Sequence, residues 1–153
     1  MSEKTIKLEI ATPERVVLTE AIAQITVPTR DGEITILPGH IPLVASLRAG
    51  VIHIKKENDE PEIISTSGGF IEVLMDKIVI LADTAEMAAE IDLARAEEAH
   101  RRAEEMKTNL RHQDDVDFAE VNAAIERELA RTHAVKRWRN IKSISGNRED
   151  KSE

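Results

Sequence analysis

The amino-acid sequence predicts a small β-sandwich or flattened barrel that is joined to an antiparallel pair of helices. All five prolines and five of the six glycines precede Phe70, whereas residues 70–145 contain neither. Short apolar alternations broken by turn residues fill the first part of the chain. After about Asp83 the sequence becomes rich in Ala, Glu and Arg, which are strong helix formers. A β domain is therefore expected to carry a helical appendage.

The β part is predicted from apolar residues that alternate with polar ones. Ile6, Leu8 and Ile10 alternate with Lys7 and Glu9, which is the period of a half-buried strand. The further runs that we expect to be strands are 16–18, 23–27, 34–37, 43–47, 51–54, 63–65, 70–74 and 78–82. Many short strands separated by Gly, Pro, Asn and Asp are typical of a sandwich or a flattened barrel.

The first helix is predicted from a capping pattern and an apolar stripe. Asp83 and Glu86 have the spacing of a capping box, so the helix is expected to begin there, or at Glu90 at the latest. Residues at about 100° intervals form its stripe and carry the helix close to Gln113. This stripe consists of Ala88, Ile91, Ala99, Ala103, Met106 and Leu110.

A second helix is expected after a turn at 114–116. Asp117 and Glu120 form another capping box, and the apolar stripe that follows is Phe118, Val121, Ile125 and Leu129. Two stripes joined by a short turn predict an antiparallel hairpin in which each helix buries what the other exposes. We expect the β-sandwich at 1–84, the helical hairpin at 85–142 and a frayed polar tail at 143–153.

Composition excludes several classes of function. The formal net charge of -8 argues against general nucleic-acid binding, which needs an excess of Lys and Arg. The absence of cysteine excludes a disulfide framework and a thiolate zinc site. With no apolar leader and no long apolar run, the chain is expected to be soluble and to reach a membrane only through a partner.

No enzyme motif is present in the sequence. There is no phosphate-binding G-x-x-x-x-G-K-[ST] loop, no H-E-x-x-H and no G-x-S-x-G, so no catalytic residue is assigned. His100 and His112 lack partners at metal-ligand spacing, and no metal site is expected. Gly68 and Gly69 fit a tight turn or bulge better than a dinucleotide fingerprint.

Arginines in unusual positions allow two interpretations. Arg95 lies within the alanine stripe of the first helix, with Asp92 before it and Arg102 after it, and Arg127 and Arg131 lie one turn apart among alanines of the second helix. One interpretation is an Asp92–Arg95 helix pair and solvated arginines that favour helix formation. The other is an anion site in which converging arginines hold a polyphosphate by bidentate hydrogen bonds.

The basic stretch near the C-terminus also has two interpretations. Residues 129–148 contain six basic side chains and no acidic one. Cations near a helix C-terminus are favoured by the macrodipole. Alternatively, they dock on an acidic partner with Trp138 as an anchor.

Several motifs together resemble a known family. They are Asp31-Gly32-Glu33, 36–43 (ILPGHIPL), 67–73 (SGGFIEV), 82–85 (ADTA), 91–96 (IDLARA) and 115–118 (DVDF). Each is short, but their order and spacing over about Ile6 to Leu129 strongly resemble the epsilon subunits of bacterial F-type ATP synthases. The resemblance implies a ten-stranded β-sandwich followed by an antiparallel two-helix hairpin.

The resemblance also implies a non-catalytic role in the central stalk. The sandwich would bind the gamma subunit and the ring of c subunits and so couple proton flow to ATP synthesis. The hairpin would lie on the sandwich or open toward the alpha and beta subunits, where it inhibits ATP hydrolysis. The chain would then be a peripheral protein on the cytoplasmic side of the bacterial cell membrane. Alternatives are an isolated nucleotide-sensing adaptor module outside the synthase, a general adaptor with a coiled-coil arm and a small enzyme.

Site residues follow from the resemblance position by position. Asp31 and Glu33 match the loop that faces the c ring, and His40 matches the gamma contact. No cofactor is required, but ATP is implied as a regulatory ligand. Its matching contacts are Glu86, Ile91, Asp92, Arg95, Arg102, Arg127 and Arg131. The cations expected to dock on acidic surface are Arg131, Lys136, Arg137, Arg139 and Lys142.

Overall fold

The computed structural model describes residues 5–110 and 118–149, with side chains up to Ser145. The strands are β1 (Ile6–Ala11), β2 (Val16–Thr29), β3 (Gly32–Ile36), β4 (Leu43–Lys56), β5 (Pro61–Val73), β6 (Lys77–Ala82) and β7 (Ala85–Met87). They are followed by the short 3-10 helix η1 (Ala88–Glu90) and by the helices α1 (Leu93–Leu110) and α2 (Phe118–Glu149). The predicted order of a β domain followed by two helices is confirmed.

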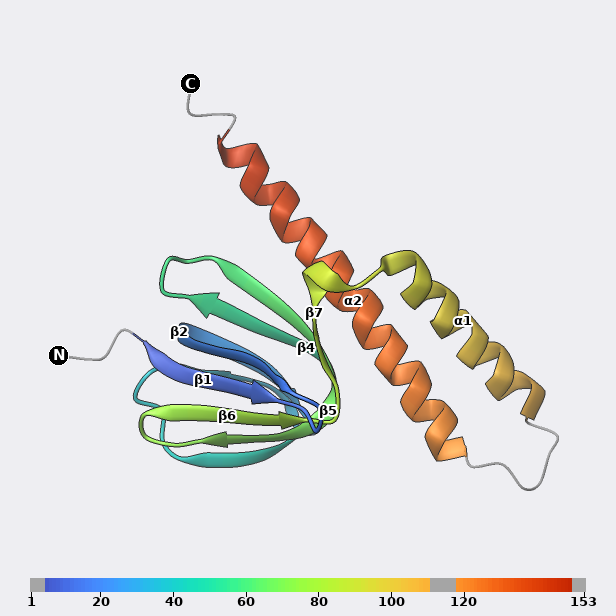
Figure 1. Ribbon diagram of the computed structural model, residues 1–153, viewed down its shortest axis with the longest axis horizontal. Helices are drawn as coiled ribbons and strands as arrows, with labels where there is room; N and C mark the ends of the chain where they lie inside the picture. Colours follow the sequence, from blue (N-terminus) through green and yellow to red (C-terminus); the bar gives the residue numbers. More distant parts are fainter. Residues whose placement is uncertain (1–4, 111–117, 150–153) are drawn as a thin grey trace.

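The strands form a sheet that closes on itself. Their order is β1-β6-β5-β4-β2-β3, and an additional antiparallel pairing of β1 with β2 closes the ring. β1 pairs with β6 in parallel, and β7 adds to β5. The result is the flattened, two-layered barrel seen edge-on in Figure 1, as the strand pattern predicted.

The expected number of ten strands is wrong, because the described residues contain seven. Three strands of 13 or 14 residues each contain two of the runs predicted separately. β4 and β5 stay paired from Leu43, opposite Val73, to Lys55, opposite Pro61. Gly68 lies within this pairing at φ 121, so of the two expected alternatives, a tight turn or a bulge, the turn is wrong at this glycine.

The core of the sandwich is built mainly from isoleucine. One side chain of every two along the strands points inward, which is the alternation that the sequence shows. The inward side chains with no exposed surface include Leu8, Ile10, Ile22, Ile25, Ile36, Ile52, Ile71, Ile78 and Ile80. Such a core makes the sandwich the rigid part of the chain.

The junction between sheet and helix differs from the prediction. Ala85 pairs with Thr66 in strand β7, so Asp83 and Glu86 do not form a capping box. The helix begins at Leu93, later than either predicted start. Its N-cap is Asp92, whose Oδ1 accepts a hydrogen bond of 3.2 Å from the backbone N–H of Arg95.

The two helices are antiparallel, and α2 lies between the sandwich and α1 (Figure 1). α2 begins at Phe118, directly after the predicted cap residue. Asp117, the turn at 114–116 and the expected end of the first helix near Gln113 lie outside the described residues. The chain is helical up to Glu149, so the expected fraying from 143 onward is wrong for 143–149. Ser145 fits the helix because its Oγ donates to the carbonyl of Ile141 at 2.9 Å.

Alanines and larger apolar side chains together make the contact between the hairpin and the sandwich. The buried members of this docking cluster are Ile63, Ala88, Ile91, Ala96, Ala134 and Val135. Met106 and Leu129 are 54% and 38% exposed. The prediction that the two apolar stripes bury each other is therefore wrong for these two residues. No helix within the described part of the chain is long and apolar enough to cross a membrane.

Candidate functional site

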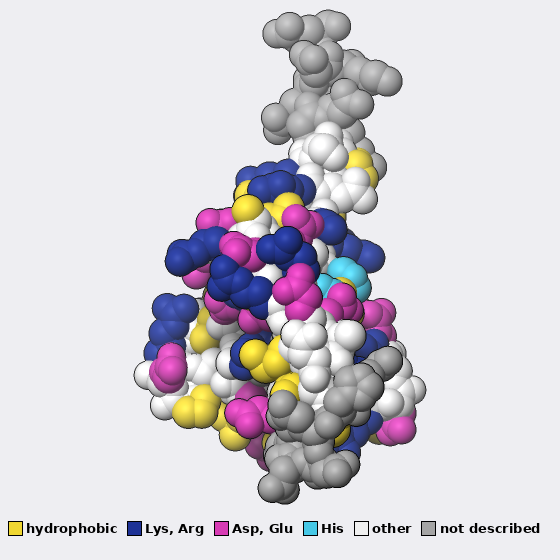
Figure 2. Space-filling model, turned by 90° about the vertical axis from the view of Figure 1, so that its right-hand side faces the viewer, with side chains coloured by type: hydrophobic (Ala, Val, Ile, Leu, Met, Phe, Trp, Pro, Cys, Tyr) yellow, Lys and Arg dark blue, Asp and Glu magenta, His cyan; other side chains and the backbone are white. Residues whose placement is uncertain are grey.

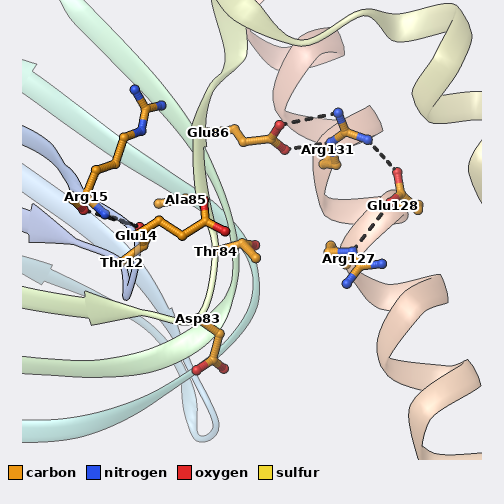
Figure 3. A pocket seen from close by; sticks show the side chains of 10 residues that line it. All are labelled: Thr12, Glu14, Arg15, Asp83, Thr84, Ala85, Glu86, Arg127, Glu128 and Arg131. Atoms are coloured by element: carbon orange, nitrogen blue, oxygen red, sulfur yellow. Dashed lines mark hydrogen bonds and ion pairs between the residues drawn. The ribbon is translucent and has the colours of Figure 1, made fainter.

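Arg131 of α2 connects the helical hairpin to the last strand of the sandwich. Its Nε donates to Oε2 of Glu86 on β7 at 2.6 Å, and its Nη1 donates to Oε2 of Glu128 at 2.8 Å. A second contact of 3.4 Å joins Nη2 to Oε1 of Glu86, which makes this pair bidentate. Figure 3 shows the guanidinium between the two carboxylates.

This cluster is partly shielded from water. The side chains of Arg131 and Glu128 are 23% and 11% exposed, while Glu86 is 42% exposed. Burial acts to lower the pKa of Arg131, but the hydrogen bonds and charges of the two glutamates outweigh it and raise this pKa. Arg131 is therefore fully charged and already has two anionic partners.

The first candidate pocket lies beside this cluster, between the sandwich and α2. It has a volume of about 460 Å³ and is lined by Thr12, Glu14, Arg15, Asp83, Thr84, Ala85, Glu86, Arg127, Glu128 and Arg131. Arg127 lies 3.5 Å from Glu128 and is 46% exposed. Acidic and basic side chains both line this pocket, so its positive charge is largely compensated.

A second candidate pocket of about 520 Å³ lies between the two helices. It is lined by Glu90, Asp92, Arg95, Glu98, Ala99, Arg102 and Arg131. Arg102 pairs with Glu98 one turn before it. Among the described residues, no carboxylate lies within ion-pair distance of the Arg95 guanidinium. The Asp92 carboxylate caps the helix backbone and does not pair with the Arg95 side chain, contrary to the simple helix-pair interpretation.

The residues predicted to bind ATP are thus divided between two neighbouring pockets. Glu86 and Arg127 line the first, three others line the second, and Arg131 lines both. Ile91 lines neither, because it is 8% exposed and belongs to the docking cluster. A polyphosphate that bridged the pockets would contact arginines of both helices, but it would have to displace carboxylates from Arg131.

The residues predicted to contact other subunits lie at the surface of the sandwich, in or next to the turns that flank β3. Asp31 and Glu33 are exposed at the turn between β2 and β3. His40 is partly exposed after β3, and its Nδ1 lies 2.7 Å from the carbonyl oxygen of Ile41. This contact fixes the ring, because the carbonyl can only accept a hydrogen bond from that nitrogen.

Sequence reasoning missed an exposed apolar row across the sandwich. Val44, Phe70, Leu81 and Val16 are 58–68% exposed. Phe70 on β5 lies opposite Leu81 on β6, and Val44 lies two residues from the partner of Phe70 on β4. The sequence could have indicated this row, because these strands carry apolar residues at the outward positions of the alternation, where polar residues are expected. Apolar side chains that gather on one face mark a surface for protein contact.

The cations expected to dock on an acidic partner are only partly free. Arg131 is paired as described, and Lys136 lies 3.2 Å from Glu97 of α1. Arg139 and Lys142 are exposed, and Lys142 lies 5.4 Å from the centre of the Trp138 ring. Because α2 continues to Glu149, these cations do not lie in its last turn. The macrodipole interpretation is therefore wrong for them. Figure 2 shows charges of both signs interspersed over the hairpin.

Comparisons with known proteins give one consistent result. Residues 5–88 match the family model of the ATP synthase delta/epsilon chain β-sandwich domain, and residues 89–136 match that of its long α-helix domain. The chain is 40% identical over 129 residues to an ATP synthase epsilon chain of Nitratidesulfovibrio vulgaris, covering 84% of this chain and 94% of that one.

Other relatives and solved structures agree. An ATP synthase epsilon chain of Natranaerobius thermophilus is 38% identical over 142 residues, which cover 92% of this chain and 99% of that one. The fold matches a chain in the structure of the Euglena gracilis mitochondrial ATP synthase with a TM-score of 0.73, at 24% identity, covering 85% and 81% of the two chains. The chain therefore belongs to the ATP synthase delta/epsilon chain family.

Proposed function

We propose that this chain is a non-catalytic epsilon subunit in the central stalk of a bacterial F-type ATP synthase. Its sandwich would bind the gamma subunit and the ring of c subunits, and its hairpin would inhibit ATP hydrolysis. The chain would lie on the cytoplasmic side of the cell membrane and be held there by the complex. The observation that carries this proposal is an isoleucine-rich core joined to a helical arm through a second, smaller apolar cluster.

The exposed apolar row supports the gamma contact. Phe70 and Leu81 face outward from a well-packed sandwich, where apolar area is otherwise costly. His40 would extend this surface, and Asp31 and Glu33 would meet the c ring. In a binding assay with purified gamma, Phe70→Ser should weaken binding by about tenfold or more, since burying a Phe contributes about 1.5–3 kcal/mol. Met106→Ser, at an equally exposed apolar position on α1, is the matched control. Equal binding by both variants would contradict the proposed surface.

The docking cluster supports a hairpin with two positions. Among the described residues, the docking cluster has six buried side chains, three of them alanines, against seventeen in the core of the sandwich. Releasing the helices therefore requires less free energy than opening that core. Opening would free Arg131 from Glu86 of the sandwich, and separation of the two helices would free Lys136 from Glu97; Glu128 lies on α2 itself and stays beside Arg131. Together with Arg137, Arg139 and Lys142, these two cations could then meet acidic surface on the alpha and beta subunits. Removing residues 91–153 keeps all seven strands. This truncated chain should still bind gamma but no longer inhibit ATP hydrolysis by the assembled enzyme.

ATP would stabilise the compact position by bridging the two candidate pockets. The supporting observation is that Arg95 of α1 and Arg127 of α2 line two pockets that share Arg131. Titration with ATP should shift the backbone amide resonances of the hairpin, and Arg95→Ala should weaken this response by about tenfold. Unchanged hairpin resonances at millimolar ATP would rule the site out.

Asp92 needs a separate control because it caps α1. Asp92→Ala would remove both the cap and the charge, and cap loss alone destabilises a helix by about 1 kcal/mol. Asp92→Asn keeps a capping oxygen and removes only the charge. A weaker ATP response in Asp92→Asn would therefore indicate a direct role of the carboxylate in binding.

A further inference from the structure

A third pocket lies on another flank of α2 and shares no lining residue with the two described above. Its volume is about 440 Å³, and its lining residues come from α2 on one side and from β2, β3 and β4 on the other. It is lined by Pro28, Glu33, Arg48, Gly50, Val51, His53, His133, Lys136, Arg137 and Asn140. We propose that this pocket binds a small phosphate-class oxyanion, which holds α2 against the sandwich.

The helix places four nitrogen-bearing side chains along one wall. His133, Lys136, Arg137 and Asn140 follow each other at intervals of three and four residues, which is one face of an α-helix. All four can donate hydrogen bonds to an oxyanion. Their common direction gives one anion several donors at once.

The sandwich supplies the opposite wall. Val51 and His53 lie two residues apart on β4 and so point to the same face, toward α2. Arg48 lies on the same strand and donates only a long hydrogen bond of 3.4 Å to the carbonyl of Ala49. An anion between Arg48 and Arg137 would therefore link strand and helix.

Among the described residues, positive charge in this pocket is compensated at Lys136, which lies 3.2 Å from Glu97, but not at the two arginines. In the first pocket Arg131 has two carboxylate partners, and in the second Arg102 has one. In the third pocket, no carboxylate among the described residues lies within ion-pair distance of Arg48 or Arg137. Glu33 is the one acidic residue in its lining. An arginine fork without a partner fits a phosphate oxyanion in a bidentate arrangement.

The state of His53 agrees with a positive local potential. Burial lowers the pKa of His53, the charge of Arg137 lowers it further, and Glu33 acts in the opposite direction. Arg48, Lys136 and His133 line the same pocket as this ring. A bound anion would reverse the effect of Arg137 and favour the protonated imidazole, so binding should strengthen as the pH falls.

The test is a titration of the full 153-residue chain with inorganic phosphate, in which binding is detected from the NMR resonances of the histidine imidazoles. Saturable shifts are expected for His53 and His133. Arg137→Gln should weaken binding by at least about tenfold, because it removes charge-assisted hydrogen bonds. Arg139→Gln, an exposed change on the same helix, should have little effect. Glu33→Gln should strengthen binding, because it removes the opposing charge.

Sulfate tests whether histidine protonation causes the pH dependence of binding, and ADP tests whether the phosphates of a nucleotide enter this pocket. Sulfate does not titrate between about pH 6 and pH 7.5, so a higher sulfate affinity at the lower pH would report histidine protonation. ADP should compete with phosphate only if its phosphates enter this pocket. Non-saturable shifts, or equal weakening by Arg137→Gln and Arg139→Gln, would overturn the proposal. Stronger binding of an acidic peptide than of phosphate, lost equally in both variants, would also overturn it in favour of a protein partner.

Binding at this pocket does not depend on the proposed response to ATP. Arg127→Ala should reduce the ATP response and leave phosphate binding unchanged, because Arg127 lines only the first pocket. Arg137→Gln should instead reduce phosphate binding and leave the ATP response unchanged. Phosphate shifts that disappear in Arg127→Ala would assign the anion to the first pocket and overturn the proposal.

Discussion

Replacing Ala134 by leucine should release the hairpin from the sandwich without unfolding the sandwich. Ala134 has no exposed surface, and it lies in the docking cluster with Ala96 and Ile63. Because Ala134 is fully buried, the larger side chain has to displace its neighbours, and overpacking of this kind costs about 1–3 kcal/mol. The isoleucine core of the sandwich does not include Ala134, so its own stability should be unchanged.

The expected shift between the compact and the open hairpin follows from this cost of overpacking. A change of about 1–3 kcal/mol shifts an equilibrium between compact and open hairpins by about 5-fold to 150-fold. Trp138 reports the shift because it is the one tryptophan of the chain and packs on the docking cluster. In Ala134→Leu its fluorescence should move to longer wavelength, and its quenching by acrylamide should increase.

A matched substitution distinguishes release of the helices from a general effect of added apolar volume. Ala123 is exposed on the same helix, so Ala123→Leu should leave the Trp138 emission unchanged. The same emission in Ala134→Leu and the parent chain would show that the cluster absorbs the added volume. The reasoning would then be refuted, because the contact between helix and sandwich would not be close-packed.

Three further predictions concern the fold and its charges. Gly69→Ala should prevent folding of the sandwich, measured as loss of the cooperative urea transition, because an added Cβ would lie 2.1 Å from a backbone carbonyl oxygen at φ 137. Arg131→Ala should destabilise the docked hairpin by about 1–3 kcal/mol in urea, because it removes the Glu86 contact and leaves the buried Glu128 carboxylate with only the longer, 3.5 Å contact to Arg127. His53→Asn should flatten the pH dependence of the free energy of unfolding below about pH 6.5. Burial and the charge of Arg137 lower the pKa of His53 in the folded state, so the unfolded chain takes up a proton first as the pH falls. The parent chain therefore loses stability in this range, and the variant without the imidazole should not show that loss.

The fold class could be predicted because its signals are local. Alternation identified every strand except β7, and the run without Gly and Pro identified the helices. The number of strands could not be predicted, because a local break in the apolar alternation, with glycine in β4 and β5 and without it in β2, ends a strand only if the neighbouring strand stops pairing there. That difference depends on pairing between distant segments. β7 was missed for the same reason, since only its pairing with β5 distinguishes it from a helix start.

The residues of the candidate site could be selected from the sequence, but their partners could not. Arg131 and Glu86 are far apart in the chain, and their contact depends on how α2 crosses the sandwich. The sequence suggested a pair between Asp92 and Arg95, yet the backbone geometry at the start of α1 makes the carboxylate a cap instead. Spacing along a chain indicates which charges can meet within one helix, while tertiary packing determines which of them do.

The paired state of Arg131 limits how strongly ATP can act on the hairpin. A triphosphate that reached this guanidinium would replace the carboxylates of Glu86 and Glu128, so one set of ion pairs is exchanged for another. Only the difference in affinity between the two positions of the hairpin shifts their balance. With ATP at about a hundred times its dissociation constant, the compact position gains about 2.7 kcal/mol. This is about the energy expected for overpacking at Ala134, so ATP and a single leucine should act on the same balance with similar strength and opposite sign.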